Sequence, residues 1–331
     1  MVAKLRVTLA CGDYDRTKAI KEGVIQPEGV ALNYIPIDRV AEIFWRMIRH
    51  EEFDVSEMSL ASYIMMRSRG DERFIAIPVF TSRFFRHSCI YVNLGAGINR
   101  PEDLKGKRVG IPEYEMTAGV WVRGLLQHDY GVEPKELSWY TGGQEEIGRE
   151  EKLSFSAPDN VQLCHVEDDT LSNMLDNGEL DALITARMPS CFRKRPLRVG
   201  RLLANYREAE QDYFGRTGIF PIMHTVVIRE HIYADNPWLA QSLFKAFEEA
   251  KDKVYAAQYD TSALYFTIPW LIPEMEETRT RMGEDFWPYG VEVNRHVLEE
   301  LMVFLVEQGL LREAMSVDEL FAPETLDSYR V

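Results

Sequence analysis

Hydrophobic and polar positions alternate along the first hundred residues in a way that predicts strands and helices in turn. Apolar, strand-like runs occur at residues 4–11, 30–37, 53–60 and 73–80. A helix is expected between the second and third runs, because apolar side chains there follow helical spacing, at Val40, Ile43, Phe44, Met47 and Ile48. Strands that alternate with helices indicate a parallel α/β sheet covered on both faces.

A second α/β unit begins near residue 100. It contains a strand at 108–112, a helix from about Thr117, and a strand–helix–strand run over 160–187. Residues 218–229 are again strand-like, and helices dominate from there to the end, at 237–258 and 295–311. The chain therefore crosses between units near 82–92 and returns near 218–228. We expect a first lobe of 1–90 plus 220–331, a second lobe of 91–219, and a ligand bound between them at strand carboxyl ends.

The first crossover carries an unusual set of side chains. The stretch TSRFFRHSCIYVN, residues 81–93, has strand composition throughout, yet it includes Arg83, Arg86 and His87. Because strand side chains alternate between faces, Arg83 and His87 are expected on one face and Arg86 on the other. Both arginines can reach one ligand only if the strand begins after a turn. These groups are the first candidates for an anion-binding site.

Composition limits the classes of partner. The 331-residue chain is 46% hydrophobic and has a formal net charge of −15, which argues against a nucleic-acid-binding protein. An anionic ligand must therefore be held by a local group of cations. No run of about 18 apolar residues predicts a membrane span, and the N-terminus does not resemble a signal peptide. Four scattered cysteines favour free thiols, so a cytoplasmic protein is expected.

Seven stretches of the chain are distinctive when taken together: LACGDYDRTKAI, FDVSEMSLASYIM, SRFFRHSCIYVN, DLKGKRVGIPEYEMTAGVWVRGLL, YTGGQEEIGREEK, GIFPIMHTVVIR and WPYGVEVNRH. In these stretches the sequence resembles the 4,5-dihydroxyphthalate decarboxylase family. This resemblance covers about residues 8–296, and it implies a type II periplasmic-binding-protein-like fold in which each of two lobes is a mixed sheet flanked by helices. It also implies a carboxy-lyase of phthalate degradation that converts 4,5-dihydroxyphthalate, or a close hydroxylated aromatic dicarboxylate, to protocatechuate and carbon dioxide.

The implied reaction sets the chemistry of the site. Each carboxylate of this substrate is para to a hydroxyl, so deprotonation of that phenol enriches the carboxylate-bearing carbon in electrons. Protonation of the carbon then allows carbon dioxide to leave. The site needs a base, a proton donor and cations for the retained carboxylate, and no cofactor is expected.

Candidates for proton transfer are His87, His224 and Glu57, of which Glu57 could also bind the catechol hydroxyls. A structural role is the alternative for each histidine. The three could also form a metal site, but no HxH or HxxE spacing supports one, and we predict no metal.

Candidates for substrate binding are more numerous. Arg83 and Arg86 are suited to carboxylates, with an ion pair to Asp or Glu as the alternative. Thr117 starts a helix and could bind the second carboxylate or act as an N-cap. Glu113 is a candidate base or orienting group. The remaining candidates, each with a surface, capping or core-packing alternative, are Arg16, Arg187, Ser59 and Tyr289; Tyr14 and Trp287 could stack on the ring or pack in the core.

Two functional hypotheses follow. The first is the decarboxylase, with a small aromatic dicarboxylate as its only partner class and homo-oligomerisation left open. The second is a solute-binding protein for an aromatic or other small carboxylate, which the lack of a signal-like N-terminus disfavours.

Overall fold

The computed structural model describes residues 3–149, 152–153, 158, 160–194 and 196–326. The chain divides into two compact units, which are described separately. The first comprises residues 1–83, 224–296 and 316–331, and the second comprises 84–223 and 297–315. None of the helices in the described parts of the chain is long and apolar enough to cross a membrane.

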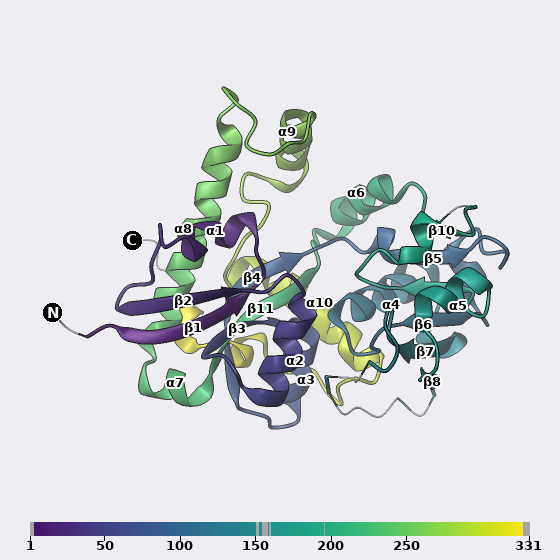
Figure 1. Ribbon diagram of the computed structural model, residues 1–331, viewed down its shortest axis with the longest axis horizontal. Helices are drawn as coiled ribbons and strands as arrows, with labels where there is room; N and C mark the ends of the chain where they lie inside the picture. Colours follow the sequence, from purple (N-terminus) through teal and green to yellow (C-terminus); the bar gives the residue numbers. More distant parts are fainter. Residues whose placement is uncertain (1–2, 150–151, 154–157, 159, 195, 327–331) are drawn as a thin grey trace. The chain divides into compact units, whose positions relative to one another are not determined.

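The first unit is built on a five-stranded mixed sheet of order β2-β1-β3-β11-β4 (Figure 1). Its strands are β1 (Leu5–Cys11), β2 (Val30–Pro36), β3 (Val55–Ser59), β4 (Phe74–Arg83) and most of β11 (Ile222–Arg229). Its helices are α1 (Asp15–Lys21), α2 (Val40–His50), α3 (Leu60–Ser68), α7 (Glu230–Asp235), α8 (Trp238–Tyr259) and α9 (Leu271–Met282). The predicted amphipathic helix is confirmed as α2, which buries Ile43, Phe44, Met47 and Ile48.

The register of this sheet brings strand ends together. β1 pairs in parallel with β2 and β3, so the carboxyl ends of all three lie at one edge. β11 pairs antiparallel with β3 and starts at that same edge, with His224 opposite Ser59. The end of β3 and the beginning of β11 therefore share one edge of the sheet.

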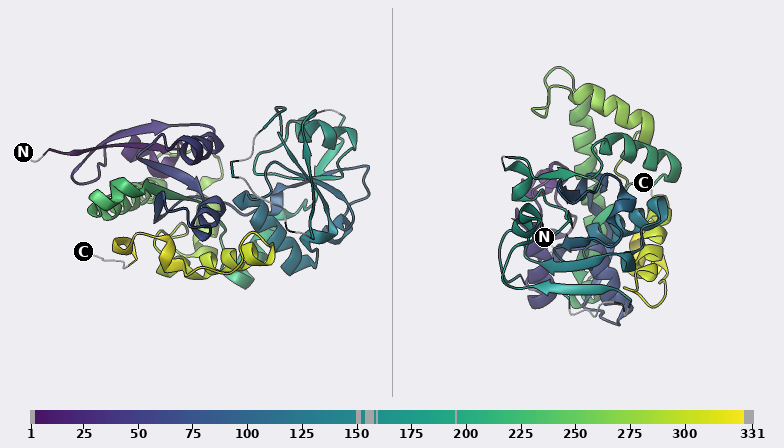
Figure 2. Two further views of the ribbon diagram at one scale, coloured as in Figure 1. Left: turned by 90° about the horizontal axis from the view of Figure 1, so that it is seen from below. Right: turned by 90° about the vertical axis from the view of Figure 1, so that its right-hand side faces the viewer.

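The second unit has a six-stranded mixed sheet of order β10-β5-β9-β6-β7-β8, and Figure 2 shows its twist. Its strands are β5 (Ile90–Asn93), β6 (Arg108–Ile111), β7 (Ser138–Gly142), β8 (Gln162–Val166), β9 (Ala182–Ile184) and β10 (Val199–Arg201). Its helices are α4 (Thr117–Tyr130), α5 (Leu171–Asn177), α6 (Tyr206–Thr217) and most of α10 (Arg295–Glu307). Part of its core is a buried apolar cluster of Tyr91, Leu171, Leu175, Leu180, Leu183, Cys191 and Val199.

Residues 297–315 belong to the second unit, whereas the predicted lobe boundaries placed all C-terminal helices in the first. The physical reason is the packing of α10 on α4. The rings of Phe304 and Trp121 meet edge to face at 5.4 Å, and Arg123 Nε donates to Gln308 Oε1 at 2.8 Å. The apolar face of α10 thus completes the core beside α4.

The prediction of one continuous strand over residues 81–93 is wrong. β4 ends at Arg83, a 3₁₀ turn covers His87–Cys89, and β5 begins only at Ile90. The chain passes from the first unit to the second between Arg83 and Phe84. Simple alternation of faces therefore does not relate Arg83 to Arg86 and His87.

Candidate functional site

The end of β3 and the start of β11 place Glu57 beside His224. Glu57 lies opposite Val226 and His224 lies opposite Ser59, so Glu57 and His224 are diagonal neighbours on the same face of the sheet. Glu57 Oε1 lies 2.6 Å from His224 Nδ1. The sheet register thus joins residues that are far apart in the sequence.

Glu57 is completely buried and accepts hydrogen bonds from several groups. Gly12 N donates to Oε2 at 2.9 Å, Tyr14 Oη donates to Oε1 at 2.9 Å, and the Cys11 thiol lies 3.5 Å from Oε2. Burial alone would raise the pKa of Glu57, but the hydrogen bonds and the interaction with His224 outweigh it and lower the pKa to about 2. The carboxyl group is therefore ionised at neutral pH.

An ionised carboxylate only accepts hydrogen bonds, so the proton in the Glu57–His224 contact belongs to Nδ1. The imidazole also packs edge to face on Phe44, with ring centroids 4.8 Å apart. Its side chain is 14% exposed, and within the described residues no hydrogen bond occupies Nε2. Nε2 is thus the position at which His224 can exchange a proton with a ligand.

Arg16, on α1, belongs to the same unit and is held rigidly. Its guanidinium lies over the Tyr14 ring at 4.0 Å and over the Trp287 ring at 4.5 Å. Arg16 Nε donates to Thr81 O at 2.6 Å, and Nη1 lies 3.3 Å from Asp15 Oδ1. Tyr14 links this cation to Glu57, because its ring contacts Arg16 and its hydroxyl bonds the carboxylate.

Arg83, predicted to bind a carboxylate, already binds groups of the first unit. It is buried, and its Nη2 donates to Pro288 O at 2.7 Å and to the side-chain oxygen of Asn294. Burial lowers the pKa of Arg83 to about 9. The guanidinium therefore binds carbonyl and amide oxygens of its own unit, and a contact between Arg83 and a substrate carboxylate stays a prediction.

Ser59 and Tyr289 are also buried in the first unit. The Ser59 hydroxyl accepts a hydrogen bond from Ser62 Oγ at 3.0 Å. Tyr289 Oη has no hydrogen-bond partner in the described part of the chain, and burial raises the pKa of this phenol. The structure thus fits a packing role for Tyr289 at least as well as ring stacking.

In the second unit, Arg86 and His87 flank the start of the 3₁₀ turn and both are buried. Arg86 donates to sulfur atoms, with Nε 3.1 Å from Met223 Sδ and Nη1 3.6 Å from Cys89 Sγ. His87 packs edge to face on Tyr213, and its Nδ1 has no hydrogen-bond partner among the described residues. Burial lowers the pKa of His87 to about 4, so its imidazole is neutral at pH 7.

Glu113 lies in a buried ionic cluster just before α4. Arg149 donates to Glu113 Oε1 at 2.7 Å, and the buried Lys152 ammonium contacts Glu113 and lies 3.3 Å from Glu115 Oε1. Burial lowers the pKa of Lys152, whereas the adjacent carboxylates favour its charged form. Two cations thus neutralise Glu113, and its predicted role as a base is not supported by this geometry.

Thr117 and Arg187 differ in exposure. Thr117 is the first residue of α4 and is buried, and Met116 rather than Thr117 is the N-cap residue. Arg187 is exposed. The loop that carries it is tied down, because Gln144 Nε2 donates to Arg187 O at 3.1 Å and Thr185 Oγ1 donates to Gln144 Oε1 at 2.5 Å. Arg187 therefore presents an exposed cation on a fixed loop.

Gly12 takes part in the site although the sequence analysis did not single it out, and the rings of Tyr14 and Trp287, expected to stack on a substrate or pack in the core, both contact Arg16. The available signal was the position of the GDYDR loop directly after a strand, where the backbone N–H of Gly12 and the Tyr14 side chain reach β3. Within the described residues, no group of three or more His, Cys, Asp or Glu side chains is arranged to hold a metal ion.

Residues 25–152 match the family described as ABC transporter, phosphonate, periplasmic substrate-binding protein. The chain is 40% identical over 331 residues to 4,5-dihydroxyphthalate decarboxylase of Comamonas testosteroni, covering 100% of both chains. It is 42% identical over 212 residues to the protein of the same name from Pseudomonas putida, covering 64% of this chain and 82% of that one.

Solved structures agree on the fold. The periplasmic sulfonate-binding protein SsuA of Methylobacillus flagellatus superposes with a TM-score of 0.53 at 13% identity, covering 98% of this chain and 93% of that one. At this identity the similarity concerns the fold alone. It confirms the predicted two-lobed periplasmic-binding-protein architecture.

Proposed function

Because the chain belongs to the 4,5-dihydroxyphthalate decarboxylase family, we propose that it is a carboxy-lyase that converts 4,5-dihydroxyphthalate to protocatechuate and carbon dioxide. The observation that carries the site assignment is the hydrogen bond between the ionised Glu57 and His224 Nδ1. It fixes the tautomer and leaves Nε2 for the substrate.

His224 is the proton-transfer residue of this proposal. When Nε2 carries no proton, it accepts the phenolic proton, and the loss of that proton activates the ring. When Nε2 is protonated, it delivers its proton to the carboxylate-bearing carbon. Glu57 stabilises the imidazolium in either step, since its negative charge is 2.6 Å from Nδ1. With no exposed surface, Glu57 acts through His224, so we assign it as a positioning residue rather than a group that binds catechol hydroxyls.

Arg16 is the proposed carboxylate-binding residue of the first unit. Its guanidinium is already oriented by two aromatic rings and by Thr81 O, so little side-chain entropy is lost on binding. A guanidinium can hold a carboxylate by paired hydrogen bonds. The predicted roles of Arg86, Arg187 and Thr117 in carboxylate binding and of His87 in proton transfer are kept as proposals for the second unit.

The solute-binding alternative has one specific observation in its favour, the match of residues 25–152 to a family of transporter substrate-binding proteins. The full-length similarity to a protein named as a decarboxylase favours the enzyme. We further propose a cytoplasmic location, which is supported by four cysteines that are all free thiols.

The test is incubation of purified protein with 4,5-dihydroxyphthalate, with carbon dioxide and protocatechuate measured over time. Turnover that is lost in His224→Gln supports both the reaction and the site. Tight binding of the dianion by wild-type protein without release of carbon dioxide would instead support the solute-binding alternative.

A further inference from the structure

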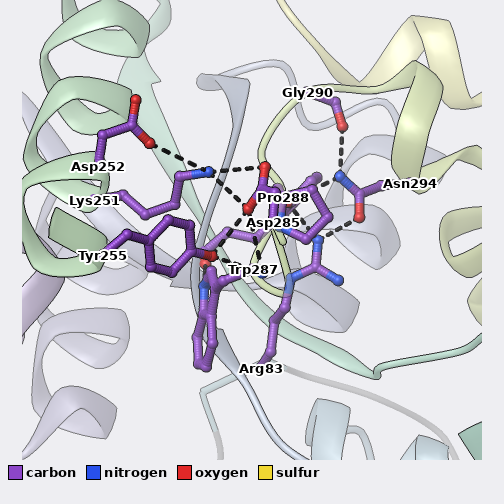
Figure 3. Close-up of polar contacts among 10 residues, drawn as sticks. Arg83, Lys251, Asp252, Tyr255, Asp285, Trp287, Pro288, Gly290 and Asn294 are labelled. Carbon is purple, nitrogen blue, oxygen red and sulfur yellow. Dashed lines mark hydrogen bonds and ion pairs between the residues drawn. The ribbon is translucent and has the colours of Figure 1, made fainter. Parts of the chain in front are cut away.

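The segment 285–294 of the first unit is bonded to the last residues of β4 (Figure 3). Gly290 N donates to Pro78 O at 2.9 Å, and the Trp287 indole donates to Phe80 O at 2.8 Å. In the opposite direction, Arg83 of β4 donates to Pro288 O at 2.7 Å. The segment is thus bonded to one strand through several of its residues.

Asn294 closes the segment on itself. Its side chain is 1% exposed, donates to Pro288 O at 3.0 Å and Gly290 O at 2.7 Å, and accepts from Arg83 (Figure 3). Because one amide serves three partners, removing it leaves buried carbonyl groups and the Arg83 guanidinium short of partners. The Asn294 side chain therefore holds this end of the segment together through its three hydrogen bonds.

α8 holds the other end. The buried Lys251 ammonium lies 3.0 Å from each carboxylate oxygen of Asp285, and Tyr255 Oη donates to the same carboxylate at 2.9 Å. Tyr255 Oη also accepts from Trp287 N at 2.9 Å. The backbone and the indole of Trp287 are consequently both fixed.

The fixed indole contacts Arg16, whose guanidinium carbon lies 4.5 Å from the ring centroid. We propose that the segment 285–294 positions the carboxylate-binding Arg16 through the Trp287 indole. Arg83, Asn294 and Lys251 are then positioning residues, because their hydrogen bonds and ion pairs hold the segment that carries Trp287. This inference rests on the proposed function, in which Arg16 binds a substrate carboxylate.

The test is a double-mutant cycle of Asn294→Ala with Arg16→Ala, read as the Kd for 4,5-dihydroxyphthalate by calorimetry beside carbon dioxide release and thermal unfolding. Asn294→Ala is expected to weaken binding about tenfold when Arg16 is present and less than twofold in the Arg16→Ala background. Tyr63→Phe is the matched control, since it removes two buried hydrogen bonds at the other end of β4, to Leu320 O and from Ala76 N. It is expected to lower the Tm and leave the Kd unchanged.

The outcomes separate this inference from the reaction itself. A Tm decrease without a change in Kd, or an equal loss of affinity in both Arg16 backgrounds, overturns the positioning role. An unchanged Kd in Arg16→Ala overturns it as well, while turnover by the wild type would still uphold the decarboxylase. Binding without turnover by the wild type refutes the proposed reaction, but the Kd values of the double-mutant cycle can still be measured and compared. Should Asn294→Ala not fold, Asn294→Asp is judged by the same criteria.

Discussion

Two buried glutamates, one in each unit, have opposite surroundings. Glu57 pairs with His224, whose Nε2 has no hydrogen-bond partner in the part of the chain that the structure describes, whereas Glu113 is neutralised by Arg149 and Lys152. Both side chains are almost completely buried. The difference teaches that burial of a carboxylate does not by itself mark a catalytic site; what matters is whether its partner can still exchange a proton with a ligand.

The largest effect is expected at His224. His224→Gln should lower kcat by about 10²- to 10⁴-fold, because general acid–base catalysis is lost, and should change substrate affinity little. Steady-state carbon dioxide release over a pH series also assigns the role. A rate that falls at low pH identifies a base, and one that falls at high pH identifies an acid. Near wild-type kcat would refute the assignment.

On the other side of the comparison, Lys152→Met should lower the free energy of unfolding by about 3–5 kcal/mol, because it leaves Glu113 and Glu115 buried without their shared cation. Denaturant unfolding measures this loss. Turnover per folded molecule is expected to stay near the wild-type value, and a large decrease in kcat would instead place the cluster in the reaction.

Glu57→Gln tests whether Glu57 is ionised in the folded protein, through the dependence of the free energy of unfolding on acid pH. The pKa of Glu57 is lowered to about 2 in the folded protein, so its charge stabilises the fold above the unfolded value near 4.3. That contribution, about 3 kcal/mol, is lost as pH falls toward 2. Unfolding between pH 6 and pH 2 should therefore depend on pH less steeply in Glu57→Gln than in the wild type. Equal slopes would contradict an ionised Glu57.

The smallest effect is expected for Arg187→Ala. The hydrogen bonds of Arg187 to other described residues involve its backbone N–H and C=O, so removal of the exposed side chain should leave the Tm within about 1 °C. The proposed carboxylate contact would appear as a loss of affinity of about three- to tenfold by calorimetry. Arg193→Ala, at another largely exposed arginine of the same unit, is the control.

Much of the architecture could be predicted from local patterns. The apolar spacing in 40–52 gave α2, and the runs at 53–60 and 73–80 correspond to β3 and β4. The break after Arg83 was not determined by local pattern, because residues 81–93 have strand composition throughout. In the structure, Phe84 N donates to Pro221 O and Arg86 Nε lies 3.1 Å from Met223 Sδ, and both partners are far away in the sequence. Residue type, position and the family resemblance together indicated His224, Glu57 and Arg16, but not the contacts among their side chains.

The sequence by itself determined the alternation of strands and helices, the family and the set of chemically capable residues, because these depend on local spacing and on motifs. Only the tertiary structure decided how those residues pair. The antiparallel register of β11 with β3 places His224 on Glu57, and β4 packing turns Arg83 toward Asn294. Partners separated by more than a hundred residues are selected by sheet register and burial, which local spacing does not encode.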